Sequence, residues 1–307
     1  MTQKIVSYGL DRNMRSILDD SVDVYEHCPK PLHEAPQSIL DQTDIAVTLV
    51  FSDINPDVCT RVNCDGIISL GAGVDHINIE ACSERDITVC NTPHYGSRTV
   101  AEHTFALLLS FERHLNAIEN KELGFDRSRY LSQQLSGKTF GAVGTGGIGK
   151  AAVRIAQGFN METIGYDVDK SQSLVDDEAF TYVSKHDVFS KSDYVGLYVP
   201  AVPGTEKTVD KKAVQGMRDD AILINTARAA VIEHQAVYNA LENNDLRGAL
   251  LDVVDEDYEE RFFNHDKSMV TPHHAFYTEQ ALQNMVEQAK EAIQSLRQGD
   301  QPRTTLN

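Results

Sequence analysis

Residues 137–156 read GKTFGAVGTGGIGKAAVRIA, a short β-forming run followed by the pattern G-x-G-x-x-G and a helix-forming run. Each glycine of the pattern has its own task. Gly144 permits a tight turn, Gly146 lets the backbone approach a pyrophosphate, and Gly149 lets the helix pack against the strand. The unpaired N–H groups and the dipole at the start of the helix favour negative charge there. The segment therefore predicts a dinucleotide-binding turn.

An acidic residue follows the next predicted strand. Residues 161–166 form that strand, and Asp167 comes directly after it, eighteen positions beyond Gly149. An acid at this place accepts hydrogen bonds from the adenosine ribose 2'-OH and repels a 2'-phosphate. The pair of signals favours NAD over NADP as the cofactor. The alternative is an ordinary strand-to-helix turn with a solvated acid at the strand end.

Short β-branched runs alternate with helical patterns along the whole chain, which is typical of a parallel sheet in an α/β protein. The runs predict strands at 4–8, 45–50, 66–70, 88–90, 140–143, 163–166, 194–199, 221–225 and 248–253. A long helix lies between the early and the late strands, where Thr99 and Glu102 read as a T-x-x-E capping box. Its apolar face is expected to contain Ala106, Leu109 and Leu115, and the helix is expected to bridge two lobes.

A second long helix is predicted near the end of the chain. Apolar residues recur at helical spacing between about 278 and 297. They are Leu282, Met285, Val286, Ala289 and Ile293.

Composition limits the class of protein. The chain has 307 residues, which suits two domains, and a hydrophobic fraction of 41%, which is enough for a sizeable core. A net charge of -18 argues against nucleic acid as a partner. No apolar run is long enough for a membrane span, and the start lacks the pattern of a secretory signal, so a cytoplasmic location is expected.

The cysteines carry little functional signal. They number five, with no Cys-x-x-Cys pair, which argues against a disulfide framework and a zinc site. We expect them to be reduced, small residues of the core.

Three side chains of different chemistry stand after late strands, where open α/β sheets present ligand-binding groups. Arg228 could hold a carboxylate and polarise a carbonyl, unless it is a plain surface arginine. The acidic run 252–257 is either functional or a solvated loop. His273 precedes the last helix and could act as a general acid or base beside a carboxylate. His274 follows it on a segment read as extended, so the two rings should diverge and no metal is expected.

Together these features resemble the D-isomer-specific 2-hydroxyacid dehydrogenases over nearly the whole chain. The residues that carry the resemblance stand in the family's order: 71–77 (GAGVDHI), 99–103 (TVAEH), 144–149 (GTGGIG), 199–200 (VP), 225–228 (NTAR), 251–253 (LDV) and 272–273 (PH). The segment 271–285, TPHHAFYTEQALQNM, is most similar to the D-lactate dehydrogenase branch.

The resemblance implies two doubly wound parallel-sheet domains, with a Rossmann NAD-binding domain (98–275) inserted into a flavodoxin-like substrate domain (1–97 and 276–307). It implies that Arg228 binds the substrate carboxylate and carbonyl and that His273 donates and accepts the proton, whereas His274 is its variable neighbour. It also implies that the amides of Ala72 and Gly73 hold the carboxylate. Leu70 and Tyr95 are then expected to face the substrate.

The resemblance also supplies the residues expected around the cofactor. Asp252 and Thr226 lie near the nicotinamide side. With the glycines of the turn and Asp167, the full cofactor set is Val100, Gly144, Gly146, Gly147, Ile148, Gly149, Asp167, Val199, Pro200, Thr205, Thr226, Ala227, Asp252, His273 and Ala275.

The chain departs from the family in the loop that should orient the histidine. Where the family has glutamate, five positions after the aspartate of 251–253, this chain has Asp257, with Asp255 and Glu256 beside it. Either Asp257 is the orienting catalytic carboxylate, or the shortened loop has slipped and Glu256 takes that place. The family's glycine after the catalytic arginine is Ala229 here.

The expected reaction is reversible hydride transfer between NADH and a small 2-keto acid, with pyruvate and D-lactate as the first pair. 2-Ketoisocaproate, phenylpyruvate, hydroxypyruvate and glyoxylate stay open as substrates. The acidic charge and the lack of an extra regulatory domain disfavour a phosphorylated substrate. The other open function is a non-catalytic, NAD-sensing corepressor of the same fold, although we expect no further domain after the last helix. The family resemblance also implies a homodimer through the helix that begins near Thr99.

Overall fold

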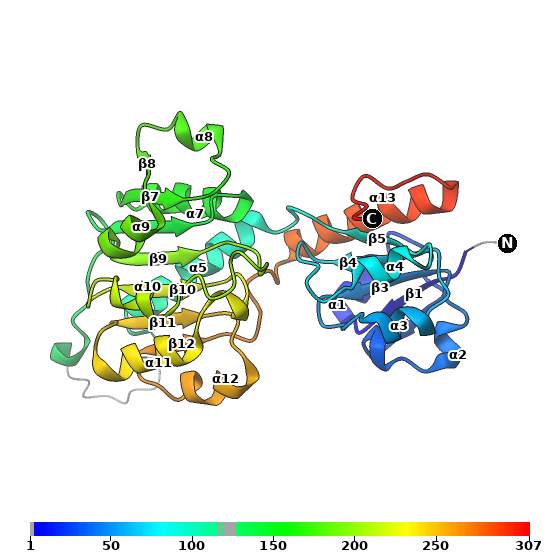
Figure 1. The fold of residues 1–307 in the computed structure, drawn as a ribbon, viewed down its shortest axis with the longest axis horizontal. Helices are drawn as coiled ribbons and strands as arrows, with labels where there is room; N and C mark the ends of the chain where they lie inside the picture. Colours follow the sequence, from blue (N-terminus) through cyan, green and yellow to red (C-terminus); the bar gives the residue numbers. More distant parts are fainter. Residues whose placement is uncertain (1–2, 116–117, 119–126) are drawn as a thin grey trace. The chain divides into compact units, whose positions relative to one another are not determined.

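The computed structural model describes residues 3–115, 118 and 127–307. The chain divides into two compact units. The first consists of Met1–Gly96 and Tyr277–Asn307, and the second of Ser97–Phe276. Each unit holds one sheet (Figure 1). No helix in the described part of the chain is long and apolar enough to cross a membrane.

The sheet of the first unit has five parallel strands in the order β2-β1-β3-β4-β5, the flavodoxin-like order. The strands are β1 (Ile5–Tyr8), β2 (Glu26–Cys28), β3 (Ile45–Leu49), β4 (Gly66–Leu70) and β5 (Thr88–Asn91). The helices are α1 (Arg12–Asp19), α2 (Gln37–Leu40), α3 (Pro56–Arg61), α4 (Ile79–Ser83) and α13 (Glu279–Gln298). Every residue of β1, β3 and β4 is buried, as expected for strands covered on both faces.

The last helix returns the chain to this unit. Thr278 caps α13 by accepting a hydrogen bond from the amide of Ala281 at 3.3 Å, and Gly299 ends it with φ +76°. The predicted apolar face is confirmed, since Leu282, Met285, Val286, Ala289 and Ile293 are all buried.

The sheet of the second unit has seven parallel strands in the order β12-β11-β10-β9-β6-β7-β8. The strands are β6 (Thr139–Val143), β7 (Glu162–Tyr166), β8 (Phe180–Tyr182), β9 (Tyr194–Leu197), β10 (Ile222–Asn225), β11 (Gly248–Leu251) and β12 (Ser268–Val270). The helices are α5 (Ser97–Glu112), α7 (Gly147–Gly158), α8 (Gln172–Val175), α9 (Lys185–Lys191), α10 (Lys211–Gln215), α11 (His234–Asn243) and α12 (Glu256–Phe263).

Alternate residues of these strands enter different cores. Ile222 and Ile224 pack with residues of α5 and α7, whereas Leu223 between them packs with residues of α9, α10 and α11. Helices therefore cover both faces of the sheet, as Figure 1 also shows. The predicted fold class, two parallel-sheet α/β domains, is confirmed.

The strands that sequence patterns did not predict are β2, β8 and β12. Each has three residues and lies at an edge of its sheet. Edge strands are half-exposed, so they lack the continuous apolar run by which a central parallel strand is recognised.

The predicted start of the long helix is wrong. Helix α5 begins at Ser97, so Thr99 lies in its first turn and cannot be its cap. Glu102 instead accepts a hydrogen bond from Nε of Arg98 at 2.7 Å, one helical turn away. The predicted apolar face is also displaced, because Ala106 is exposed and Leu115 lies beyond the end of the helix. The buried side chains are Val100, Ala101, Thr104, Phe105, Leu107, Leu108 and Glu112.

Candidate active site

The candidate residues of the second unit follow the carboxyl ends of neighbouring strands. From one side of the sheet to the other, His273 follows β12, Asp252 follows β11, Arg228 follows β10, Gly144 follows β6 and Asp167 follows β7. All strands are parallel, so these ends meet at one edge. The strand order reverses between β9 and β6, the switch point at which open α/β sheets bind ligands.

The glycine-rich turn has the geometry that a dinucleotide needs. Gly144 has φ +94°, and a Cβ there would lie 2.7 Å from the carbonyl carbon of Tyr198. A Cβ on Gly149 would lie 2.0 Å from the carbonyl oxygen of Gly144, so only glycine fits between the turn and the helix. A Cβ on Gly146 would meet no atom within 4 Å. The space next to Gly146 is therefore open for a ligand.

The helix that follows the turn has no side-chain cap. Gly146 is the N-cap of α7 and provides no side-chain acceptor for the first amides, which include those of Gly147 and Ile148. An anionic oxygen at this place would accept from these N–H groups and interact favourably with the helix dipole. The donor set fits the pyrophosphate of NAD.

Asp167 lies beside the turn, at the end of β7. Its Oδ2 accepts from the amide of Thr145 at 2.5 Å and from the Thr145 hydroxyl at 3.0 Å. Its Oδ1 accepts from the amide of Asp169 at 3.1 Å. The carboxylate is therefore oriented at the place where the sequence puts the ribose contact.

Arg228 stands on a turn that a buried asparagine shapes. Asn225, fully buried at the end of β10, donates from Nδ2 to the carbonyl of Arg228 at 2.9 Å and accepts from the amide of Ala227 at 3.1 Å. Nη1 of Arg228 donates to the carbonyl of Ala227 at 2.9 Å. The motif contained Asn225, but its shaping role was missed. The usable signal was an asparagine as the last residue of an otherwise apolar strand.

His273 has left-handed backbone, with φ +52°, so the extended conformation expected for 273–274 is wrong. The reason is a set of hydrogen bonds to one neighbour. The amide of His273 donates to the carbonyl of Asp252 at 2.8 Å, and the amides of His274 and Ala275 donate to its carboxylate at 2.8 and 3.0 Å. Asp252 is 1% exposed. It therefore determines the backbone path on which His273 stands.

The acidic run after β11 forms the start of helix α12. Asp255 is the N-cap residue of α12, and its carboxylate lies 3.0 Å from Nδ1 of His234. Glu256 and Asp257 are exposed in the first turn of that helix. Burial of the His234 ring lowers its pKa, although the charge of Asp255 opposes that shift. The run is thus a helix start rather than a plain solvated loop.

The other cofactor candidates of this unit lie on the same strand ends or on α5. Thr205 donates to the carbonyl of Pro200 and accepts from the amide of Val202 at 3.0 Å, which closes the loop after β9. The hydroxyl of Thr226 lies 3.4 Å from that of Thr104 on α5. Val100 on α5 and Ala275 are buried, and Val199 and Ala227 are half-buried.

The candidate substrate residues of the first unit follow β4 and β5. Leu70 is the last residue of β4 and is buried. The amide of Gly71 donates to the hydroxyl of Thr92 at 2.8 Å, which ties the loop 71–73 to the end of β5. The amides of Ala72 and Gly73 donate to no residue in the part of the chain that the structure describes. Tyr95 is half-buried, and its carbonyl accepts from Asn284 at 3.2 Å.

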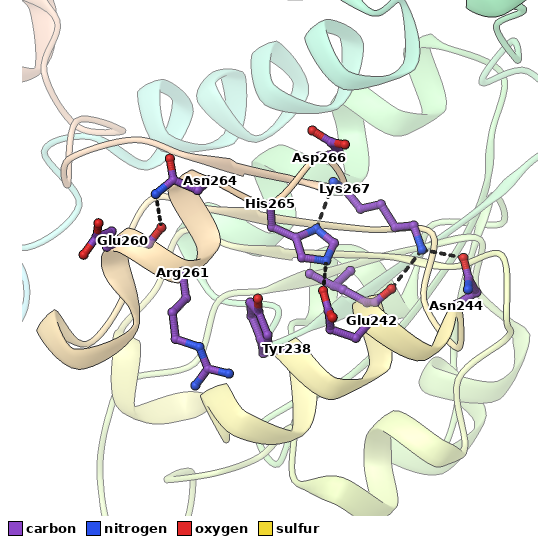
Figure 2. Close-up of a pocket in the computed structure, with 10 residues that line it drawn as sticks. Tyr238, Glu242, Asn244, Glu260, Arg261, Asn264, His265, Asp266 and Lys267 are labelled. Carbon is purple, nitrogen blue, oxygen red and sulfur yellow. Dashed lines mark hydrogen bonds and ion pairs between the residues drawn. The ribbon is translucent and has the colours of Figure 1, made fainter.

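Figure 2 shows a groove elsewhere in the second unit, between α11, α12 and the start of β12. Nε2 of His265 lies 3.0 Å from Glu242, and Nζ of Lys267 donates to Asn244 at 2.6 Å. The groove lies where β12 begins, whereas the candidate residues lie where the strands end. It is therefore a feature separate from the candidate site.

Comparisons with known proteins agree with this geometry. The family model for the NAD binding domain of D-isomer specific 2-hydroxyacid dehydrogenases matches residues 104–275. The chain is 30% identical to the glyoxylate reductase of Pyrococcus furiosus, over 98% of this chain and 94% of that protein. It is also 30% identical to the D-lactate dehydrogenase of Treponema pallidum, over 91% of this chain and 89% of that protein.

A solved structure extends the similarity to both units. The D-lactate dehydrogenase of Aquifex aeolicus, complexed with NAD and lactic acid, superimposes with a TM-score of 0.85. The two sequences are 25% identical, and the match covers 97% of this chain and 96% of that chain. With its glycine-rich turn and its two parallel sheets, this NAD-dependent oxidoreductase of 2-hydroxy acids belongs to the D-isomer specific 2-hydroxyacid dehydrogenase family.

Proposed function

We propose that this enzyme reduces a small 2-keto acid to the D-2-hydroxy acid with NADH, and that pyruvate is its preferred substrate. One observation carries the proposal. Neighbouring strand ends bring the turn of Arg228, the buried Asp252 and the left-handed His273 to the same sheet edge as the glycine-rich turn. A carboxylate binder, a proton donor and a nicotinamide cofactor are the parts that this reaction needs.

The proposed tasks of the residues follow from their chemistry. The planar guanidinium of Arg228 would hold the substrate carboxylate and polarise the adjacent carbonyl oxygen. The imidazolium of His273 would give its proton to that oxygen as negative charge develops there. NADH, when bound, supplies the hydride. Asp257 would orient the imidazole, with Glu256 as the alternative carboxylate.

We propose that residues 1–97 with 276–307, which differ from the first unit by one residue at each boundary, form the substrate domain. In the described part of the chain the amides of Ala72 and Gly73 donate to no other residue, so they are available to donate hydrogen bonds to the far oxygens of a carboxylate. Leu70 and Tyr95 would lie against the side chain of the substrate.

The substrate is tested with a panel of NADH-dependent reductions. Pyruvate, 2-ketobutyrate, 2-ketoisocaproate, phenylpyruvate, hydroxypyruvate and glyoxylate are compared by kcat/KM, because the relatives include both D-lactate dehydrogenases and glyoxylate reductases. We expect pyruvate to give the highest value. A higher value for glyoxylate or another keto acid would replace pyruvate in the proposal. If the protein binds NADH but reduces none of these keto acids, the result would favour the NAD-sensing corepressor.

We also propose a homodimer through α5 and a cytoplasmic location. Ala106 on α5 is exposed within the single chain, which leaves that face available to a second copy. All five cysteines are buried and free of disulfides, which suits a reducing compartment. Sedimentation of the wild type against Ala106→Arg tests the dimer, because a buried guanidinium at a two-fold contact would dissociate it.

A further inference from the structure

A chain of hydrogen bonds connects α5 to the backbone of His273. Nε2 of His103 lies 3.0 Å from the hydroxyl oxygen of Thr271, and that hydroxyl donates to Oδ1 of Asp252 at 2.6 Å. The carbonyl oxygen and both carboxylate oxygens of Asp252 then accept hydrogen bonds from the amides of residues 273–275. Three successive amides, those of residues 273–275, thus donate to Asp252. The carboxylate of Asp252 is connected in turn to His103 on α5 through the hydroxyl of Thr271.

The direction of each bond follows from the inventory of hydrogens. An ionised carboxylate only accepts, so the single hydroxyl hydrogen of Thr271 is committed to Asp252. His103 must therefore donate its Nε2 hydrogen to the oxygen of Thr271. The same nitrogen lies 3.5 Å from Oδ1 of Asp252. His103 is consequently held as the tautomer with hydrogen on Nε2.

Burial keeps this ring neutral. Desolvation lowers the pKa of His103, the charge of Asp252 opposes that shift, and the ring of His274, with its centroid 6.4 Å away, adds to it. The side chain of His103 is 18% exposed and that of Asp252 is 1% exposed. A neutral donor completes the network without bringing a second charge next to the carboxylate, so a single arrangement of the bonds is favoured.

We propose that His103 and Thr271 are positioning residues for the proton transfer. They keep the carboxylate of Asp252 in one orientation, and Asp252 keeps His273 in a backbone conformation that a non-glycine residue rarely adopts. The proposal rests on the proposed role of His273 as proton donor. Neither residue touches the substrate in this scheme, so loss of either should reduce kcat while leaving substrate and NADH binding nearly unchanged.

The test compares two substitutions of His103 with a matched control. His103→Leu removes the donor, whereas His103→Gln keeps an amide N–H at a similar reach. His265→Leu is the control, because that histidine is also largely buried and paired with an acid, but lies in the groove of Figure 2. Thr271→Ser and Thr271→Val form a second pair, in which the hydroxyl is kept or lost.

We expect His103→Leu and Thr271→Val to lose about 10- to 100-fold in kcat, the effect of misplacing a catalytic group by a fraction of an ångström to an ångström. KM for keto acid and for NADH should change by less than about threefold. His103→Gln and Thr271→Ser should recover most of kcat, and His265→Leu should match the wild type. A loss of kcat in His103→Leu that His103→Gln fails to recover, or that His265→Leu equals, would overturn the positioning role.

Hydrogen exchange of the peptide containing residues 271–276 separates this proposal from the proposed function. The amides of His273, His274 and Ala275 should exchange faster in His103→Leu than in the wild type, and near the wild-type rate in His103→Gln. Unchanged exchange in His103→Leu would refute the network whatever the activity. If exchange is faster in His103→Leu but the wild type reduces no keto acid of the panel, the proposed function would be refuted and the hydrogen-bond network would be supported.

Discussion

Two alanine substitutions in the glycine-rich turn should have opposite consequences. A methyl group on Gly149 would lie 2.0 Å from the carbonyl oxygen of Gly144, whereas one on Gly146 would meet no atom of the protein within 4 Å. Gly149→Ala should therefore damage the fold, and Gly146→Ala should damage only cofactor binding. Gly158→Ala is the control, because that glycine ends the same helix, is exposed and has open space around it.

The magnitudes follow from these distances. Non-bonded heavy atoms in proteins stay at least 3.0 Å from a Cβ atom, so Gly149→Ala must shift the turn or the helix by about 1 Å. Overpacking of this kind lowers the stability of the fold by about 1 to 3 kcal/mol. Gly146→Ala should leave stability equal or slightly higher. It should deprive the pyrophosphate of about two charge-assisted hydrogen bonds, each worth about 1.5 to 3 kcal/mol. A loss of about 3 kcal/mol corresponds to roughly a hundredfold rise in Kd for NADH.

The assay pairs thermal unfolding without cofactor with fluorescence titration of NADH. Gly149→Ala should lower Tm by several degrees, Gly146→Ala should keep Tm and lose NADH affinity, and Gly158→Ala should keep the affinity and gain up to about 1 kcal/mol in stability. Unchanged NADH affinity in Gly146→Ala would show that the pyrophosphate does not rest on this turn. An unchanged Tm in Gly149→Ala would refute the close contact of turn and helix.

Three further predictions concern cofactor choice and the catalytic candidates. Asp167→Ala should weaken the binding of NADH by about 1 to 3 kcal/mol and the binding of NADPH far less. A wild-type enzyme with a higher kcat/KM for NADPH than for NADH would contradict the assigned role. Arg228→Lys should keep NADH binding by titration but lose at least about a hundredfold in kcat/KM for pyruvate, since a point charge cannot reproduce a planar fork, and near-normal turnover would move the carboxylate site elsewhere. In the proposed role Asp257 would stabilise the imidazolium form of His273, so Asp257→Asn should move the alkaline limb of the kcat/KM profile for reduction to lower pH by up to about one unit. An unmoved limb in Asp257→Asn with a shifted one in Glu256→Gln would instead identify Glu256 as the orienting carboxylate.

The glycine-rich turn could be predicted because its requirements are local. The positive φ at Gly144 and the close contact of Gly149 with Gly144 arise within a few residues of the chain. The central strands were equally readable, since burial on both faces produces continuous apolar runs. The start of α5 was not, because Thr99 and Glu102 have the spacing of a capping box whether or not the helix has already begun.

The acidic run shows where local patterns stop. Sequence spacing made Asp257 the counterpart of the family's glutamate, but spacing says nothing about which carboxylate a folded loop directs inward. In the structure Asp255 is bound to His234, 21 positions earlier in the chain, and Glu256 and Asp257 occupy the first turn of α12. Only the packing of α12 against its neighbours determines this division.

By itself the sequence determined the fold class, the dinucleotide turn, the acid beside it and the family, because each depends on residue types at fixed short spacings. The tertiary structure alone decided how His273 is held. Its left-handed backbone depends on Asp252, and the orientation of Asp252 depends on Thr271 and on His103, which are 168 positions apart. Contacts of that separation leave no periodic pattern in the chain. They exist only because parallel strands deliver their carboxyl ends to one edge, where a buried carboxylate must find its hydrogen-bond donors among whatever side chains the fold has brought there.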